Sequence, residues 1–246
     1  MIEFDDVTFR RNGRPIISHM SFGINELERV AVIGGSGAGK TTILKLVMGL
    51  LHPDSGSIRI DGVDITEVSE KHMRDVRMKF SIVFQEGALF DSLSVKENVA
   101  FFLREYTHLD EQQLDNRVRK LLARVGVENA YGLMPEELSG GMQRRVAIAR
   151  SLAVRDPKMF LYDEPTSDLD PISAGTIRRL IVDLADEGRG FIIVTHEMHD
   201  AFAIADRFMF IKGGKALFDG PREPFEKSDI PEIRKFIDES TVGASR

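Results

Sequence analysis

The chain has 246 residues, enough for one large domain or two small ones. Its 33 basic and 39 acidic residues give a net charge of −6, which argues against a dedicated nucleic-acid-binding protein, because such proteins carry a basic excess. The lack of cysteine excludes disulfides and thiolate metal sites, and no apolar run reaches the roughly 18 residues of a membrane helix.

Strand and helix patterns alternate in the first part of the chain. Residues 29–33 (RVAVI) form a short apolar run that predicts a buried strand, and residues 41–51 have helical spacing. A turn is expected at residues 53–56 (PDSG), followed by strands at 57–60 and 80–84. This alternation indicates an α/β domain with a largely parallel sheet.

The middle of the chain changes to mostly helical patterns, from about residue 85 to residue 156. Residues 110–125 have the apolar spacing of an amphipathic helix, with Asp110 as its N-cap. Further strands are predicted at residues 158–162, 191–195 and 207–211. A polar tail from about Pro221 contains one expected helix, 230–239. The simplest architecture is a nucleotide-binding α/β core with an inserted helical subdomain.

A phosphate-binding loop lies between the first predicted strand and helix. The segment GGSGAGKT fits G-x-x-x-x-G-K-[ST] in the context that the motif requires, which argues against a glycine-rich turn without a ligand. Backbone amides and the helix N-terminus would bind phosphates, Lys40 would reach the β- and γ-phosphates, and the Thr41 hydroxyl would bind Mg²⁺. The nucleotide-binding residues predicted here are Gly34, Gly35, Ser36, Gly37, Ala38, Gly39, Lys40, Thr41 and Thr42.

Two acids follow the predicted strand at 158–162. A parallel sheet binds ligands at the carboxyl ends of its strands, and adjacent strand residues point to opposite faces. We therefore expect different roles: Asp163 would hold Mg²⁺ through water, and Glu164 would act as general base on the attacking water. Acids in a solvated turn are the alternative, which the phosphate loop upstream makes the weaker one.

Two further polar residues end predicted strands. His196 could hydrogen-bond the γ-phosphate and orient the attacking water, and Gln85 could sense both the metal and the γ-phosphate. Either residue alone is more often structural. The predicted catalytic residues are Glu164, His196, Gln85 and Lys40, and the predicted metal ligands are Thr41, Gln85 and Asp163.

The order GGSGAGKT, FQ, LSGG, YDE, SDLD and a histidine resembles the nucleotide-binding subunits of ATP-binding cassette (ABC) transporters over nearly the whole chain. The resemblance implies an ATPase with the P-loop NTPase fold: a RecA-like core with an antiparallel β subdomain and an inserted helical subdomain. It divides a single domain, residues 1–246, into a core at 1–84 and 157–220, a helical part at 85–156 and a tail at 221–246.

The resemblance also implies a head-to-tail homodimer with ATP between the subunits. Ser139, Gly140 and Gly141 would then contact the γ-phosphate bound by the partner chain, and residues 167–170 (SDLD) would cross between the two sites. Asp168 stands where many relatives have glycine, and we expect a solvated loop carboxylate there. Met142 replaces a common glutamine, and we expect it to pack under the helix. An aromatic residue often stacks on adenine in relatives; here Arg11 is favoured over Phe9, and the choice stays open.

Several finer segments are similar to the ATPases of MCE-type (Mla-like) lipid transporters: LSGGMQRR, FQEGALFDSLSVKENVAF, LREYTHL and IRKFIDES. That similarity implies phospholipid transport between bacterial membranes, with a transmembrane permease, a membrane-anchored MCE lipid-binding protein and, in some systems, a small regulatory subunit. The chain would sit at the cytoplasmic side of the inner membrane, and in some members the tail reaches the neighbouring subunit.

Coupling to the permease is expected through residues 86–90 and the helical subdomain, in a cleft for a short permease helix. Leu89 and Phe90 could form a contact patch there or pack in the core, and the sequence leaves both open.

Three alternatives remain. An importer of amino acids or ions, or a lipoprotein-release exporter, is disfavoured by LSGGM with GALF. A non-transport ABC ATPase of DNA repair or translation would carry a long coiled coil or two cassettes. A generic phosphate-loop kinase or GTPase would leave LSGG and His196 without roles.

Overall fold

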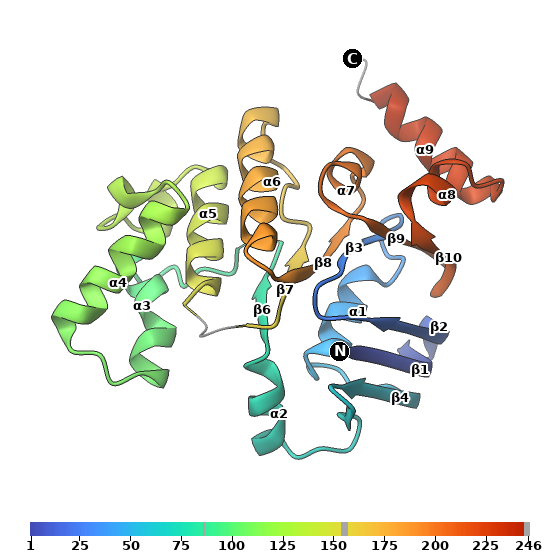
Figure 1. Cartoon of the computed structure of the whole chain (residues 1–246), viewed down its shortest axis with the longest axis horizontal. Helices are drawn as coiled ribbons and strands as arrows, with labels where there is room; N and C mark the ends of the chain where they lie inside the picture. The colour runs from blue at the N-terminus through green and yellow to red at the C-terminus, as the bar shows by residue number, and fades with distance from the viewer. Residues whose placement is uncertain (86, 154–156, 244–246) are drawn as a thin grey trace.

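The computed structural model describes residues 1–85, 87–153 and 157–243, without the side chains of 240–243. Two β-sheets and a separate group of helices make up the fold (Figure 1). In the view of Figure 1 a helical group, residues 95–151 with helices α3 to α5, lies on one side, and the smaller antiparallel sheet lies on the other. The larger sheet runs between them. This is the α/β arrangement that the alternating pattern and the inserted helical region predict.

The larger sheet has six strands in the order β10-β9-β3-β8-β7-β6. The strands from β9 to β6 are parallel, and β10 pairs antiparallel with β9 at the edge. Their bounds are Arg29–Ile33 for β3, Phe80–Val83 for β6, Met159–Asp163 for β7, Gly190–Thr195 for β8, Arg207–Lys212 for β9 and Lys215–Pro221 for β10. The five parallel strands confirm the five predicted apolar runs to within one residue at each end, whereas β10 was not predicted.

Alternate residues of the parallel strands supply two separate cores. In β3, Ala31 and Ile33 face a core shared with the helical group, and Val30 and Val32 face the other sheet. A strand buried on both faces is apolar throughout, because each neighbouring residue points to a different core. This explains why the runs read as continuous hydrophobic segments rather than alternating ones.

The smaller sheet is antiparallel, with the order β2-β1-β4-β5. Its strands are β1 at Ile2–Arg11, β2 at Arg14–Ile24, β4 at Ser55–Ile60 and β5 at Val63–Asp64. Two predicted bounds were wrong here. Helix α1 ends at Val47 instead of residue 51, because Gly49 adopts a left-handed φ of 59°, and β4 begins at Ser55 inside the predicted turn, where Ser55 pairs with Thr8.

Helix α1 (Lys40–Val47) joins the two sheets. Its apolar residues share one core with side chains of both β1 and β3. Each fully buried aliphatic side chain there stabilises the fold by about 1.5–3 kcal/mol relative to exposure. The phosphate loop, which leads into α1, is therefore fixed between two packed layers.

The helical group consists of α3 (Val95–Tyr106), α4 (Glu111–Arg124) and α5 (Gly140–Ser151), with short 3₁₀ turns at Glu128–Ala130 and Pro135–Glu137. Ser94, Asp110 and Ser139 cap the three helices by accepting a hydrogen bond from a backbone N–H in the first turn. The predicted helix at 110–125 and its Asp110 cap are confirmed. Residues 154–156 of the predicted helical region lie outside the described residues.

The remaining helices cover the sheets or follow them. They are α2 at Glu70–Arg77, α6 at Pro171–Asp186, α7 at Met198–Ile204, α8 at Arg222–Glu226 and α9 at Pro231–Gly243. Helix α9 confirms the predicted tail helix and packs on its own chain, with the rings of Phe210 and Phe236 5.3 Å apart. Residues 244–246 of the tail lie outside the described residues. Among the helices described, none combines the length and the apolar character needed to cross a membrane.

Candidate functional site

The phosphate loop lies between β3 and α1, as predicted. Gly34 and Gly39 are required by close approach: a Cβ on Gly34 would lie 2.3 Å from the Ile211 carbonyl oxygen, and one on Gly39 would lie 2.8 Å from Ile17 Cδ1. A Cβ on Gly35 or Gly37 would meet nothing within 4 Å. One side of the loop is thus packed and the other is open, as a phosphate cradle requires.

The Lys40 ammonium is held inside the loop. Its Nζ donates to the carbonyl oxygens of Gly34 at 2.9 Å and Gly35 at 3.2 Å, and lies 3.3 Å from Glu164 Oε1. Lys40 is only 6% exposed. A buried ammonium with these partners is positioned for anionic oxygens at the mouth of the loop.

Thr41 and Asp163 meet although 122 residues separate them. The Thr41 hydroxyl donates to Asp163 Oδ1 at 2.8 Å. Burial raises the pKa of the Asp163 carboxyl above its ordinary value of 3.8, and the charge of Glu164 adds to the rise, against the Thr41 hydrogen bond and the charges of Lys45 and Lys40. A hydroxyl and a carboxylate are the oxygen ligands that Mg²⁺ prefers.

Asp163→Asn is expected to stabilise the nucleotide-free fold at pH 7. A carboxyl whose folded pKa is raised costs stability above that pKa, and the cost is lost as the pH falls toward 3.8. The variant should melt a few degrees higher at pH 7, with a difference that shrinks on acidification. Thermal unfolding from pH 7 downward measures it. Asp183→Asn, at an exposed carboxylate, is the control, and a lower melting temperature of Asp163→Asn at pH 7 would contradict this account.

Glu164 and His196 form a pair at the ends of β7 and β8. Glu164 Oε2 accepts from the His196 backbone N–H at 3.2 Å and lies 2.8 Å from the ring Nδ1. Glu164 is 7% exposed, whereas the side chain of His196 is 48% exposed. The two adjacent acids therefore have different neighbours, Asp163 facing Thr41 and Glu164 facing Lys40 and His196, as the sequence predicted from their opposite directions.

Gln85 is exposed and shares a cavity of about 370 Å³ with His196. The cavity also contains Asp168, which is exposed and adopts a left-handed φ of 61°. Asp is one of the few residues that tolerates this conformation, which glycine adopts without cost. The expectation of a solvated loop carboxylate at Asp168 is confirmed.

A second cavity, of about 490 Å³, extends from the phosphate loop to the smaller sheet. Phe9 and Arg11, both on β1, line it together with residues 37–42. Both candidates for adenine stacking are therefore next to the phosphate loop. The preference for Arg11 stays a prediction.

The segment Ser139–Gly141, called the signature segment below, lies apart from the cavity of Arg11 and Lys40. Ser139 and Gly140 are exposed at the start of α5, where Ser139 Oγ accepts from the Met142 N–H at 3.3 Å, and neither lines the cavity of Arg11 and Lys40. Gly141 is fixed by packing, since a Cβ there would lie 2.8 Å from Ser173 Oγ. Met142 packs against the core, as expected.

Three residues close to Glu164 and His196 form a cluster that the sequence did not predict. Thr166, Arg178 and Asp200 lie on three different elements and border the cavity of Gln85 and His196. The sequence offered one signal, an acid at Asp200 four residues after His196, but only Asp200 lies on α7.

The residues present fit ATP with Mg²⁺. The loop leaves open space beside Gly35 and Gly37 next to a buried ammonium, and Thr41 and Asp163 supply adjacent oxygen ligands. No cluster of three or more His, Asp or Glu residues that could hold a metal occurs in the described part of the chain. Magnesium ions bound with substrate phosphates commonly have this limited protein coordination.

Comparisons with known proteins identify the family of this chain. A family model described as "ABC transporter" matches residues 17–167. The intermembrane phospholipid transport system ATP-binding protein MlaF of Haemophilus influenzae is 38% identical over 247 residues, covering 100% of this chain and 93% of the relative. A protein of Mycobacterium tuberculosis named probable ribonucleotide transport ATP-binding protein mkl is 37% identical, covering 98% and 67%.

Among solved structures, a dimeric post-hydrolysis state of the ATP-binding cassette MJ0796, bound to ADP and Pi, superposes with a TM-score of 0.83 at 29% identity. The match covers 90% of this chain and 98% of that one. The two-sheet architecture is thus the ABC cassette fold. From its fold, its phosphate loop and these matches, the chain belongs to the ABC transporter family and is an ABC-type ATPase.

Proposed function

We propose that this ATPase powers phospholipid transport between bacterial membranes together with an MCE-type permease complex. The observation that carries the proposal is the full-length match to MlaF, whose name assigns it to an intermembrane phospholipid transport system. The chain would bind a transmembrane permease at the cytoplasmic side of the inner membrane, with an MCE lipid-binding protein and, in some assemblies, a small regulatory subunit.

The catalytic unit in this proposal is a head-to-tail homodimer. The exposed signature segment at Ser139 and Gly140 lies outside the cavity of Lys40 and Arg11, so each chain presents two separate halves of a phosphate site. A second copy would place its Ser139–Gly141 segment over the open side of the phosphate loop. Closure then excludes water from the nucleotide and completes the catalytic set.

Within each site the chain's own residues bind and orient ATP. The phosphate loop and Lys40 hold the β- and γ-phosphates, and Arg11 stacks on adenine. Thr41 and Asp163 would hold Mg²⁺, and Gln85, which lines the cavity of His196, would be a further ligand. Bound Mg²⁺ would neutralise the charge that develops on the phosphate oxygens.

Glu164 is the general base for the attacking water. Glu164 is buried beside Lys40 at the end of β7, and His196 fixes the direction of its side chain through two contacts. The ring of His196 is half-exposed and its Nε2 lies 3.3 Å from Glu197 Oε1, a contact that it would exchange for the γ-phosphate. Positioning of the water and stabilisation of charge, rather than covalent chemistry, are what phosphoryl transfer needs from the protein.

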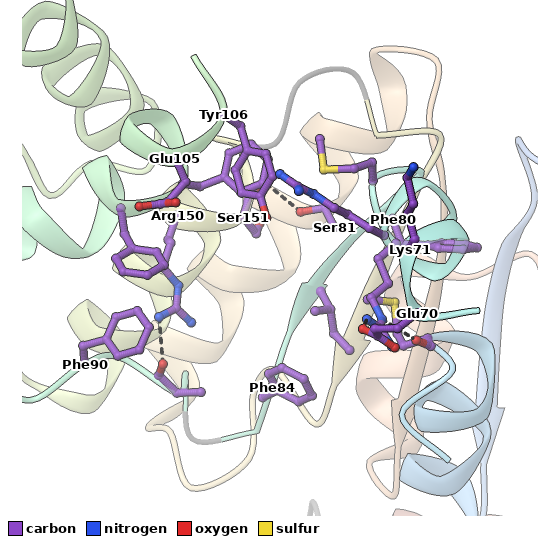
Figure 2. A pocket seen from close by; sticks show the side chains of 18 residues that line it. Glu70, Lys71, Phe80, Ser81, Phe84, Phe90, Glu105, Tyr106, Arg150 and Ser151 are labelled. Carbon is purple, nitrogen blue, oxygen red and sulfur yellow. Dashed lines mark hydrogen bonds and ion pairs between the residues drawn. The ribbon is translucent and has the colours of Figure 1, made fainter. Parts of the chain in front are cut away.

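A groove of about 850 Å³ between α2, α3 and α5 is the proposed site for the permease helix (Figure 2). Its walls carry partly exposed rings: Phe90 is 42% exposed, Phe101 47% and Tyr106 44%. Leu89 instead packs against the core, so the two residues that the sequence left open take different roles. Glu86, the first residue of the predicted coupling surface, lies outside the described residues.

Two arginines contact the walls of the groove. Arg150 donates to the carbonyl oxygens of Ala88 at 2.7 Å and Gly87 at 2.9 Å and lies over the Phe90 ring, while Arg74 lies over Tyr106 (Figure 2). These contacts connect the chain segment after Gln85 to α5, which begins at the signature motif. A helix in the groove would therefore move together with both halves of the ATP site, which suits coupling through two-state closure.

Affinity purification of the full chain from native membranes, with mass spectrometry of bound chains and lipids, tests the proposal. A multispanning permease, an MCE protein and phospholipid are expected. Phe101→Asp should lose all three, whereas Val63→Asp, at an equal exposure of 47% on the smaller sheet, should keep them. ATP affinity of both variants should match the parent. Recovery of a permease with a hydrophilic-solute binding protein would contradict the lipid assignment.

Recovery of a hydrophilic-solute binding protein would instead support the second candidate, an ABC transporter of another cargo such as amino acids or ions. The similarity to mkl, named for probable ribonucleotide transport, favours keeping it. The site and its ATPase chemistry are the same in both cases, so only the permease and the copurified ligand separate them.

A further inference from the structure

We infer that Asp200 is a positioning residue for ATP hydrolysis, which holds the segment after Glu164 against the helix after His196. The inference rests on the proposed role of Glu164 as general base. It concerns three residues for which the sequence suggested no function: Thr166, Arg178 and Asp200.

Asp200 lies on α7 and is 3% exposed, so both carboxylate oxygens depend on protein partners. Thr166 Oγ1 donates to Oδ2, and Arg178 Nη1 donates to Oδ1. The ring Nδ1 of His199 lies 3.8 Å from Oδ1. One buried carboxylate therefore joins the loop after β7, helix α6 and helix α7.

The residues Thr166 and Asp200 lie close in the chain to Glu164 and His196. Thr166 follows Glu164 by two residues, and Asp200 follows His196 by four. At the front, Glu164 Oε2 contacts the His196 backbone and ring at 3.2 and 2.8 Å. The contact between Thr166 and Asp200 thus adds a further attachment between the two segments, beyond the contacts that His196 and Lys40 make with the Glu164 carboxylate.

Arg178 explains why a charge can be buried here. Its side chain is 18% exposed on α6 and pairs with Asp200. A buried ion pair contributes little net stability compared with apolar packing, but a fully satisfied polar network specifies one arrangement of the elements that it joins. Helix α6 also carries Ser173, which contacts the signature residue Gly141. The network thus connects the general base, the histidine loop and the neighbourhood of the signature motif within one chain.

Thr166→Val tests the inference, because valine keeps the shape of threonine and removes only the donor. A displacement of Glu164 should lower kcat for ATP hydrolysis about 10-fold or more, since catalysis is sensitive to misplacements of the order of 1 Å. ATP affinity and KM should stay close to the parent values, because none of the three network residues lines the cavity of Arg11 and Lys40. Thr166→Ser, which restores the hydroxyl, should restore kcat.

The measurements are phosphate release by the full chain, equilibrium ATP binding and thermal unfolding, for both variants and for Asp200→Asn. An unchanged kcat in Thr166→Val overturns the inference. So does a joint fall of kcat, ATP affinity and melting temperature that serine does not restore, since that pattern reports a merely structural role. Glu164→Gln, measured alongside, separates the two proposals: if it keeps the parent rate, the base assignment fails, and if it is inactive while Thr166→Val is normal, only the positioning role fails.

Discussion

Glu164→Gln is expected to lower kcat for ATP hydrolysis by about 100-fold or more, the usual contribution of a positioned general base, while ATP binding persists. Glutamine keeps the shape of Glu164 and its hydrogen bond with the His196 backbone N–H, but it cannot accept a proton from water. If the nucleotide is bound between two chains, as proposed, the variant should accumulate as an ATP-dependent dimer.

Phosphate release and size-exclusion chromatography with ATP measure these two effects. Glu187→Gln is the matched control, since Glu187 is an exposed glutamate beside Arg124 and Arg189, outside the site. It should hydrolyse ATP at the parent rate. A Glu164→Gln monomer with normal turnover would show that another group activates the water.

Lys40→Ala and Ser139→Arg are expected to separate binding from closure. Removal of the Lys40 ammonium takes away a charged contact to the phosphates and should weaken ATP affinity about 10- to 100-fold, as the loss of a charge-assisted hydrogen bond does. Ser139→Arg should leave the affinity of the single chain unchanged, because Ser139 is exposed and lies outside the cavity of Lys40. It should nevertheless abolish the ATP-dependent dimer.

Calorimetric ATP titration and size-exclusion chromatography distinguish the two variants. Mixing them provides the control: one of the two sites in a mixed dimer combines an intact phosphate loop with an intact signature segment, so part of the hydrolysis should return. If Ser139→Arg weakens ATP binding by the isolated chain as much as Lys40→Ala does, the two segments act within one chain and the shared-site model is wrong.

The parallel strands of the larger sheet could be predicted from local patterns, whereas β1, β2 and the helices α2, α6, α7 and α8 were not. The buried strands were evident because a strand in a parallel sheet covered on both faces is continuously apolar, as 29–33 and 191–195 show. The end of α1 was missed because Gly49 stops a helix whose apolar spacing continues to residue 51. The edge strand β10 was missed because it is partly exposed, and its mixed composition resembles a loop.

The candidate site also has residues that local motifs predicted and contacts that they did not. The predicted residues Lys40, Thr41, Asp163, Glu164 and His196 belong to short motifs that follow predicted strands, and the structure brings them together at one sheet edge. Arg11 lines the cavity of Lys40, and Gln85 lines the cavity of His196.

The sequence by itself determined the chemistry: a phosphate loop, an acidic pair and a histidine, each recognisable because it depends on a local order of residues at a strand end. Only the tertiary structure decided which side chains meet. Thr41 reaches Asp163 across 122 residues, and Thr166 reaches Asp200 across 34. Such contacts follow from strand order, register and side-chain direction, which depend on packing between layers and cannot be specified by any single segment.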